Sequence, residues 1–330
     1  MSTLPRSPAL LVLPRLRIQS ANAISSPLTH GFPSMTAFLG FMWALERRLA
    51  DTDFAIGLQS VGVICHDFDE QVTDGGYVKA FRLSRNPVDR DGSTAAIVEE
   101  GRIHLDITLV FGVKGRFAQQ DDAQRQAFAD GIGSIVASMR LAGGSVFAPT
   151  RHDQRTRPWL RMVDQDPAAA RDQFRRWRRY WLPGFALVAR DDLLQQRIGL
   201  SQNGTKAPPM DAWLDLSRFN WRSRRIETKN ENTGESNARI EWAHDRTEGW
   251  IVPIPVGYAA LSDLHEPGTV RNARDQGTPF RFVESLYSIG QWIGPHHLSH
   301  PDQLLWYAHS DDAQGVYRCR NDYARSVSDN

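Results

Sequence analysis

The stretch IHLDITLVFGV at residues 103–113 predicts the clearest strand of the chain. Its first apolar residues recur at every second position, with His104, Asp106 and Thr108 between them. Alternation with a period of two is typical of a strand that buries one face against a core. We therefore place the other elements by working outward from this strand.

Toward the N-terminus, the sequence predicts three more strands and one helix. The strands lie at residues 10–18, 55–66 and 77–83, and the helix runs from Pro33-Ser34 to about residue 50. Residues 84–96 have little apolar content and much turn chemistry, so we expect a projecting loop. The two predicted faces of the first strand are Leu10, Val12, Leu16 and Ile18 on one side, and Leu11, Leu13, Arg15, Arg17 and Gln19 on the other, which turns basic at its end.

Toward the C-terminus, Asp121 and Asp122 predict the start of a helix that continues to about residue 140. A glycine loop at residues 141–147 follows and leads straight into a strand. Strand, helix, strands, helix and strand in this order predict an α+β fold with a ferredoxin-like antiparallel sheet over residues 1–150. RNA-recognition domains are built on the same plan.

Residues 151–249 predict a basic helical insertion into this fold. We expect a basic helix at 167–181, a short strand at 184–189 and two further helices at 191–219. Residues 222–248 are charged and almost free of aliphatic side chains, which predicts a mobile loop. Residues 250–330 are expected to form a C-terminal extension whose strands complete or flank the core, beginning with a proline-containing edge strand at 250–256.

The composition is typical of a soluble globular protein, with 41% hydrophobic and 23% charged residues in a chain of 330. No run of 18 or more apolar residues occurs, and Pro14 and Arg15 interrupt the apolar N-terminal stretch. We therefore expect neither a membrane span nor a signal peptide, and a cytoplasmic location. Cys65 and Cys319 lie far apart and without a second pair for a zinc site, so we expect plain thiols.

The basic residues are unevenly chosen and unevenly placed, although the net charge is only +1. All but four of the 39 are arginines, which bind phosphate in a bidentate way and stack on bases, although GC-rich codon usage would also favour arginine. Eleven arginines and four acidic residues lie in the segment from Arg140 to Arg190. This segment is therefore basic, and the rest of the chain is mildly acidic. This division is typical of a protein that contacts both RNA and basic protein neighbours.

Several stretches, in order along the chain, resemble one known family. They are residues 13–28 and 31–40, RNPVDRDGSTAAIVEE at 85–100, MRLAGGS at 139–145, LPGFALV at 182–188 and PGTVRNAR at 267–274. In these stretches the chain resembles the Csy-type small RAMP subunits (the Cas-five group) of type I-F CRISPR surveillance complexes, or Cascade. The resemblance runs from near residue 10 to near residue 320. It is weakest at residues 189–248, and we infer nothing from the family for that segment.

The resemblance implies a RAMP fold and RNA binding without catalysis. A subunit of this kind caps the 5′ handle of the guide RNA (crRNA) together with the large subunit of the complex, and it lies next to a backbone RAMP subunit. Base pairing then reads the foreign sequence while protein holds the nucleic-acid backbone. For this chain the resemblance implies no catalytic residue, no cofactor and no metal, with target DNA as a further candidate partner.

The predicted RNA contacts fall into five groups. Short hydroxyls and a helix start could hold phosphate, a glycine loop lets a backbone approach RNA closely, and arginines bind phosphate or stack on bases. In each group the competing interpretation is structural: turn formation, helix capping or a solvated charged face. The residues are Asn22, Ser25, Ser26 and Ser34; Arg85, Asn86 and Arg90; Arg140, Gly143, Gly144 and Ser145; Arg175 and Arg178; and Arg271, Asn272 and Arg274.

Two other functions remain open from the residues. One is a metal-independent RAMP endoribonuclease that processes the crRNA precursor, with His30 as the best candidate for acid or base catalysis. The other is a protein-interaction module whose arginines bind acidic partners only. His296, His297 and His300 lie near Asp302, but no spacing offers a plausible third metal ligand.

Overall fold

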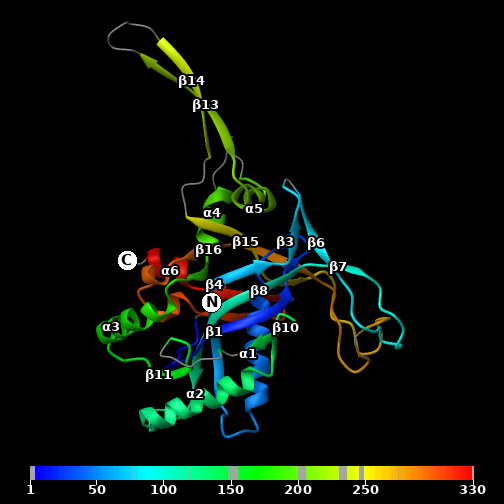
Figure 1. The fold of residues 1–330 in the computed structure, drawn as a ribbon, viewed down its shortest axis with the longest axis vertical. Coiled ribbons are helices and arrows are strands. Elements are labelled where there is room, and N and C mark those ends of the chain that lie inside the picture. The colour runs from blue at the N-terminus through cyan, green and yellow to red at the C-terminus, as the bar shows by residue number, and fades with distance from the viewer. Residues whose placement is uncertain are drawn as a thin grey trace.

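The computed structural model describes residues 4–76, 78–117, 119–147, 149, 155–199, 206–229, 236–244, 249–273 and 275–328. These residues form a mixed α/β fold in which the strand pairings are antiparallel (Figure 1). The helices of this part of the chain are α1 (Met35–Leu49), α2 (Asp122–Val136), α3 (Pro167–Trp177), α4 (Asp191–Gly199), α5 (Pro209–Ser217) and α6 (Tyr323–Ser328). None of the helices in the described ranges is long and apolar enough to cross a membrane.

The first half of the large sheet comes from the N-terminal 147 residues. Its strands lie in the order β4-β8-β1-β10-β9. Along the chain, α1 lies between β1 and β4, and α2 lies between β8 and β10. Apart from short strands in the connecting loops, the predicted order of elements is confirmed. The strand bounds are β1 (Ala9–Asn22), β4 (Gly57–Glu70), β8 (Arg102–Lys114), β9 (Arg140–Leu141) and β10 (Gly144–Phe147).

The first two helices cover one face of this half-sheet. Ser34 caps α1, because its side chain accepts a hydrogen bond from the backbone N–H of Thr36. Asp121 and Gln124 form a reciprocal capping box at the start of α2. Burial of the apolar stripes of both helices against the sheet stabilises this core, whose members include Phe38, Met42, Ile107, Phe111 and Ile132.

A bulge in β1 changes which of its residues face the helices. The register against β8 shifts between Leu13 and Leu16, and Arg15 takes a φ of 56°. Pro14 has no N–H to donate to a ladder, so the irregularity falls where regular pairing is already weakened. The predicted faces were therefore wrong on the N-terminal side of the bulge. Leu11, Leu13, Leu16 and Ile18 lie in the helix-side core, and Leu10 and Val12 lie in a second core on the other face.

The face of the sheet opposite α1 and α2 is only partly covered. α3 continues into a 3-10 turn at Arg178–Trp181, which together confirm the predicted helix at 167–181. Phe174, Trp177 and Trp181 join Leu10 in the second core cluster. Farther along β1, Arg17 and Gln19 are exposed among the residues that the structure describes.

The second half of the sheet returns to β4, so that the pairings form a closed path. β4 pairs with β17 at Val61 and Trp306, and with β12 at Ile64 and Cys65. Between them the path runs β12-β16-β15-β18-β17. The indole N–H of Trp306 also donates to the carbonyl of Leu187 at 2.8 Å, which joins β17 to β12. The strand bounds are β11 (Trp159–Met162, paired with β1), β12 (Phe185–Ala189), β15 (Trp250–Ala260), β16 (Val283–Ile293), β17 (Trp306–Asp311) and β18 (Val316–Asn321).

The prolines of β15 lie where one side of that strand is unpaired. Pro253 and Pro255 pair with β16, whereas β18 pairs only from Gly257 onward. Because proline cannot donate to a ladder, it suits a locally free edge. The edge expected at residues 250–256 is therefore confirmed for this half of the strand.

Residues 222–248 differ from the predicted loop. The structure has a hairpin here, β13 (Trp221–Lys229) and β14 (Ser236–His244), with Trp221 opposite His244 and Lys229 opposite Ser236. It extends away from the large sheet (Figure 1). The loop was predicted from the near absence of aliphatic residues. A two-stranded ribbon that is exposed on both faces does not pack against a core and needs few aliphatic residues. Their near absence therefore does not distinguish such a ribbon from a loop.

Shorter strands occupy the connections on either side of β4. β2 (Ile24–Ser26) and β3 (Thr29–His30) form a small hairpin before α1. β5 (Val72–Asp74), β6 (Lys79–Ser84) and β7 (Val98–Glu100) form a separate sheet between β4 and β8. The connection at residues 85–97 extends from the body of the molecule, as predicted (Figure 1).

Candidate nucleic-acid interface

The open part of the β1, β4 and β8 face forms a groove of about 870 Å³, which we call the sheet groove. It begins where the cover provided by α3 ends, on the C-terminal side of the β1 bulge. Its arginine and amide side chains come from β1, His104 comes from β8 and Phe147 from β10, while Phe68 of β4 lies at its border. The lining includes Arg15, Arg17, Gln19, Phe68, His104 and Phe147.

A chain of hydrogen bonds holds the bulge at the edge of the groove. The backbone N–H of Arg15 donates to the hydroxyl of Thr108 at 3.2 Å. One ring nitrogen of His66, Nε2, lies 2.7 Å from the same hydroxyl, and Nδ1 lies 2.7 Å from the carbonyl of Pro183. Since a carbonyl only accepts, Nδ1 carries the proton, and Nε2 accepts from Thr108. Burial lowers the pKa of His66 below its usual value of 6.5, which keeps the ring neutral.

The sheet groove mixes positive and negative groups. Arg15 Nη1 lies 3.3 Å from Asp106 Oδ2, and Asp67 also lines the groove. Phe68 and Phe147 are 49% and 50% exposed, so much of each ring is open to a ligand. Guanidinium groups bind phosphate, exposed rings stack on bases, and carboxylates accept from base amino groups. The groove therefore offers contacts to both the phosphate and the base of a nucleotide.

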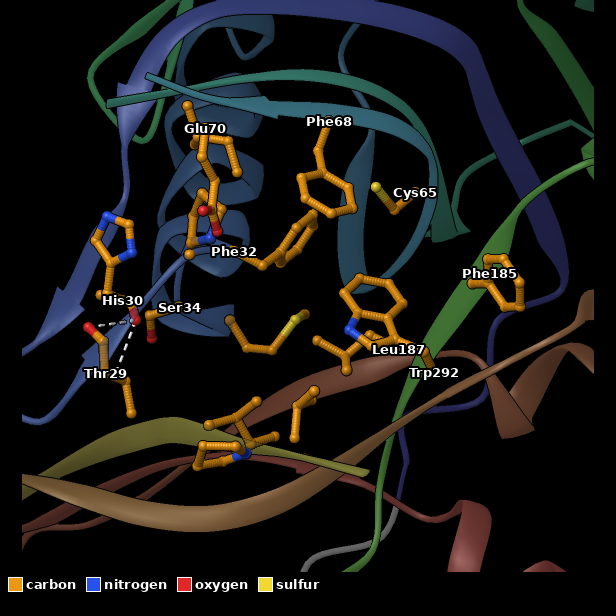
Figure 2. Close-up of a pocket in the computed structure, with 18 of the residues that line it drawn as sticks. Thr29, His30, Phe32, Ser34, Cys65, Phe68, Glu70, Phe185, Leu187 and Trp292 are labelled. Atoms are coloured by element: carbon orange, nitrogen blue, oxygen red, sulfur yellow. Dashed lines mark hydrogen bonds between the residues drawn. The ribbon is translucent and has the colours of Figure 1, made fainter. Parts of the chain in front are cut away.

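A smaller cavity of about 320 Å³ adjoins the groove, and we call it the aromatic pocket. Asp67 and Phe68 line both. Figure 2 shows Phe68, Leu187 and Trp292 turned toward its centre, with His30, Ser34 and Glu70 on the other side. Cys65 lies in the wall, where burial raises its pKa to about 12 and keeps the thiol protonated.

The first predicted group is engaged in holding its own loop. The Asn22 side chain exchanges hydrogen bonds with the backbone of Ile24, at 2.8 and 3.1 Å. Ser25 and Ser26 both bond Thr29 Oγ1, at 2.8 and 2.7 Å. Ser34 caps α1 and donates to the carbonyl of Pro255 at 3.2 Å. Turn formation and helix capping, the structural alternatives, thus account for these residues, although Ser25 and Ser34 also line the aromatic pocket.

The glycine loop is a tight two-residue turn between β9 and β10. Ala142 and Gly143 have φ values of 48° and 79°, the pattern of a type I′ hairpin. A Cβ on Gly144 would lie 2.7 Å from the Gln19 carbonyl oxygen, so this glycine is required by the approach of β1. Arg140 and Ser145 are exposed and opposite each other on the two strands.

The two loop groups remain exposed. Arg85 Nε donates to the carbonyl of Ala95 at 2.8 Å and so braces the projecting loop, whereas Asn86 and Arg90 point to solvent. Arg271 is exposed, and Asn272 has a φ of 61°. Arg274 lies outside the described residues. In the view of Figure 1, the loops after β6 and after β15 extend to the same side of the sheet.

The basic helix needs one correction. Arg175 is exposed and lies 3.3 Å from Asp172, as the second and third turns of a solvated helix allow. Arg178, which was predicted to point outward, turns back instead and donates to the carbonyl of Leu298. Burial lowers the pKa of its guanidinium. The reason is that the α-helix ends at Trp177, so the helical spacing used for the prediction no longer applies at residue 178.

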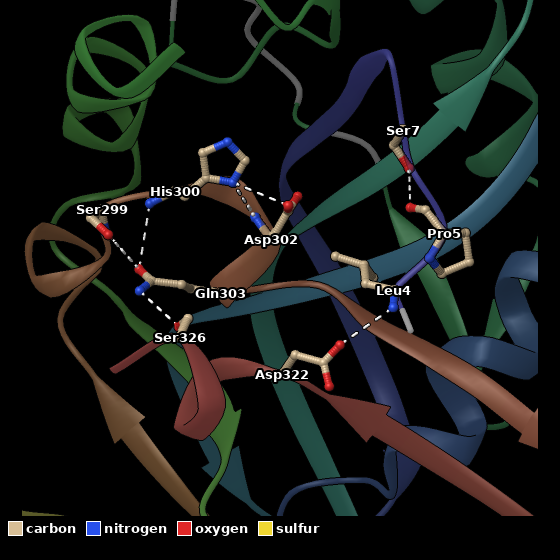
Figure 3. A network of polar contacts seen from close by, with 9 residues as sticks. All are labelled: Leu4, Pro5, Ser7, Ser299, His300, Asp302, Gln303, Asp322 and Ser326. Atoms are coloured by element: carbon tan, nitrogen blue, oxygen red, sulfur yellow. Dashed lines mark hydrogen bonds and ion pairs between the residues drawn. The ribbon is translucent and has the colours of Figure 1, made fainter. Parts of the chain in front are cut away.

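His300 and Gln303 belong to a network of hydrogen bonds that reaches α6. Figure 3 shows His300 capping a short turn through the backbone N–H of Asp302, 3.3 Å from Nδ1. Gln303 accepts from the N–H of Ser299 and donates to Ser326 in α6. Among the described residues, no group of three or more histidine, cysteine or acidic side chains could hold a metal.

Comparison with known proteins identifies the family. The family model described as CRISPR-associated protein (Cas_Csy2) matches residues 11–319. The chain belongs to the Csy2 family. A Csy2 relative, "CRISPR-associated protein Csy2" of Pseudomonas aeruginosa (strain UCBPP-PA14), is 46% identical over 315 residues, covering 94% of each chain. The resemblance to Csy-type subunits of type I-F CRISPR complexes is thus confirmed at the level of the Csy2 family.

Several groove residues of this Csy2 family member were not among the predicted contacts. Arg15, Arg17 and Gln19 lie on the β1 face whose basic end is visible in the sequence, so a signal for them existed. Phe68 and Phe147 had no such signal, because the exposure of a residue on β4 or β10 depends on which other elements pack nearby. Of the predicted residues, the structure brings Ser25 and Ser34 together at the aromatic pocket and leaves the arginine loops apart from it.

Proposed function

We propose that this chain is a non-catalytic RNA-binding subunit of the type I-F Csy complex, which caps the 5′ handle of the crRNA together with the large subunit. The observation that carries the proposal is the sheet groove, an open sheet face bearing Arg15, Arg17 and Gln19 beside the exposed ring of Phe147, with Phe68 at its border. Arginine contacts to phosphate give affinity, and base stacking on rings adds a contribution that is tolerant of sequence.

The strand order supports a ferredoxin-like RAMP core for this function. In the order β4-β8-β1-β10, α1 and α2 lie on one face, and the part of the other face that α3 does not cover is left for a ligand. RNA-recognition domains use the open face of such a sheet and place stacking residues on it. The large-subunit and backbone-subunit partners follow from the family resemblance and belong to the proposal.

The position of Arg17 in the sheet groove predicts that this side chain contributes to RNA affinity. We expect Arg17→Ala in the full chain to weaken binding of single-stranded RNA with the crRNA 5′ sequence, and to reduce the slope of log K against log salt by about 1. Arg47→Ala is the matched control, because Arg47 is exposed on α1 and lies outside the groove lining. Fluorescence anisotropy over a range of salt concentrations measures both. Equal effects of the two substitutions would contradict the groove as the RNA site.

The endoribonuclease alternative is tested in the same preparation. The ring of His30 lies 5.0 Å from that of Phe81 at the rim of the aromatic pocket. If the chain only binds, repeat RNA is recovered intact after incubation, and His30→Ala changes nothing in a denaturing gel. Cleavage products that disappear in His30→Ala would replace the binding role with RNA processing.

A further inference from the structure

We propose that the aromatic pocket binds one unstacked nucleobase of the RNA strand that lies in the sheet groove, with a preference for bases that carry an exocyclic amino group. This inference rests on the proposed RNA-binding function. It assigns a base-recognition site to a cavity formed by β3, α1, β4, β12, β15 and β16.

The walls of the pocket are aromatic and partly open. Phe32 and Trp292 pack edge to face with ring centroids 4.8 Å apart, and Trp250 lies 5.5 Å from Phe185 in the same geometry. Phe68, Phe185 and Trp250 are 49%, 45% and 47% exposed, although each borders the cavity. Three half-exposed rings from three different strands leave π-faces available, and such faces stack on bases.

The size of the cavity favours a base over a larger ligand. Small-molecule sites usually have volumes of about 300–1,000 Å³, and this cavity of about 320 Å³ lies at the lower end. One ring system fits the deep part, while sugar and phosphate remain outside. Phe32 and Trp292 are mostly buried and form the floor.

The polar side chains of the pocket are two carboxylates, small hydroxyls and the imidazoles of His30 and His66. Among the described residues that line it there is no arginine or lysine, whereas Asp67 and Glu70 are present. Glu70 lies close over Gly31, since a Cβ there would be 3.4 Å from Glu70 Oε1. A pocket whose described lining has carboxylates and neither arginine nor lysine disfavours phosphate. It suits the amino groups of adenine, cytosine or guanine, which donate to carboxylates, and it suits uracil less.

The position of the pocket connects it to the phosphate contacts. Asp67 and Phe68 separate the pocket from the sheet groove, where Arg15 and Arg17 lie. A strand that follows the groove can therefore turn one base past Phe68 while its backbone stays beside the arginines. An apolar side chain of a partner subunit would use the rings but not the carboxylates or the groove, so the observations favour the base.

The test is a double-mutant cycle between RNA and protein. Synthetic RNA with the crRNA 5′ sequence carries one abasic site, moved position by position, and binding to the full chain is measured by anisotropy. We expect one position at which the abasic site weakens binding about tenfold or more. Trp250→Ala and Phe68→Ala should remove that penalty at that position alone, because the lost base and the lost ring share one contact.

Matched controls define each outcome. Trp221→Ala removes a ring that is 59% exposed on the hairpin, away from the pocket, and should leave every penalty unchanged. Uridine at the sensitive position should weaken binding relative to cytidine in the wild type but not in Glu70→Gln. RNA that binds normally, with penalties unaffected by Trp250→Ala and Phe68→Ala, would overturn the pocket and leave the proposed function standing.

Two other results would also be decisive. Wild-type chain that binds no RNA would overturn the proposed function and the pocket together. If Trp250→Ala instead abolishes co-purification with another Csy subunit, while all abasic penalties persist, the pocket accommodates a protein side chain and the base assignment is wrong.

Discussion

Thr108 is a buried polar residue whose hydroxyl serves two partners at once. It accepts from the backbone N–H of Arg15 and donates to Nε2 of His66, and it is 1% exposed. The side chain therefore fixes both the β1 bulge and the tautomer of the histidine. Arg15 is held on the groove side of the sheet by the same contact.

Thr108→Val keeps the shape of the side chain and removes both hydrogen bonds. We expect a loss of about 1–3 kcal/mol in the free energy of unfolding, because the partly buried N–H of Arg15 and ring nitrogen of His66 lose their partner. Urea denaturation measures the loss. The control is Thr73→Val in exposed β5, where the change should be within about 0.5 kcal/mol.

His66 should make stability depend on pH. Its pKa is lowered in the folded state relative to 6.5, so the neutral ring stabilises the fold. This contribution is fully present above pH 6.5 and is lost as the pH falls through the lower folded pKa. We expect the wild type to lose more stability than His66→Gln between pH 7 and pH 5. Parallel curves for the two proteins would show that the histidine is not held neutral.

Gly143 and Gly144, at the turn between β9 and β10, are required for two different reasons. Gly144→Ala should cost about 1–3 kcal/mol, since its Cβ would press on the backbone of β1, which cannot move aside as a flexible side chain can. Gly143→Ala should cost about 1–2 kcal/mol, because it meets open space and suffers only from its positive φ. Thermal unfolding ranks the two. A larger loss for Gly143→Ala would mean that β1 yields at this point.

The β13–β14 hairpin shows how an element can be present without supporting the core. Trp221, Ile240 and Trp242 are all more than half exposed, and the ribbon extends from the body of the protein (Figure 1). Two strands alone bury little apolar surface, so they add little stability to the rest.

Replacing residues 222–243 by a short glycine-serine linker should therefore leave the fold intact. We expect the free energy of unfolding to change by less than about 0.5 kcal/mol, the range typical of surface changes. Chemical denaturation of the shortened and full chains gives the comparison. A large drop would show that the hairpin packs on the sheet in solution.

Most elements of the fold could be predicted from local sequence signals. The alternation of apolar and polar residues predicted β8, and the capping residues Ser34 and Asp121 predicted the starts of α1 and α2. The bulge in β1 was missed because a single uninterrupted period was assumed across Pro14, whose missing N–H was the available signal. The hairpin was missed because polar residues on both faces are common to ribbons and loops.

Trp306 stands where the two halves of the sheet meet. It is fully buried, pairs with Val61 of β4 and donates to the Leu187 carbonyl of β12. We expect Trp306→Phe to cost about 2–4 kcal/mol, because it leaves a cavity and an unpaired carbonyl. The matched control is Trp221→Phe on the exposed hairpin, and calorimetry of both variants measures the difference. Similar unfolding temperatures would show that this junction carries little of the stability.

The candidate site could be predicted only in part, because it is assembled from the whole chain. The basic end of β1 was visible in the sequence, but the aromatic pocket draws on residues from Ser25 to Trp292. No local pattern shows that Phe68 and Trp250 border one cavity. The predicted serines were recognised as polar loop residues, and their engagement in the loop and helix cap depends on contacts that only the folded chain provides.

The closed path of strands sets a constraint on synthesis. The edge of β4 is synthesised early, yet Trp306, which pairs with Val61 of that edge, follows much later in the chain. Until then the nascent chain exposes an unpaired edge, which invites mispairing with other chains. The path of strands can therefore close only after β17 has been synthesised, however early β4 becomes available.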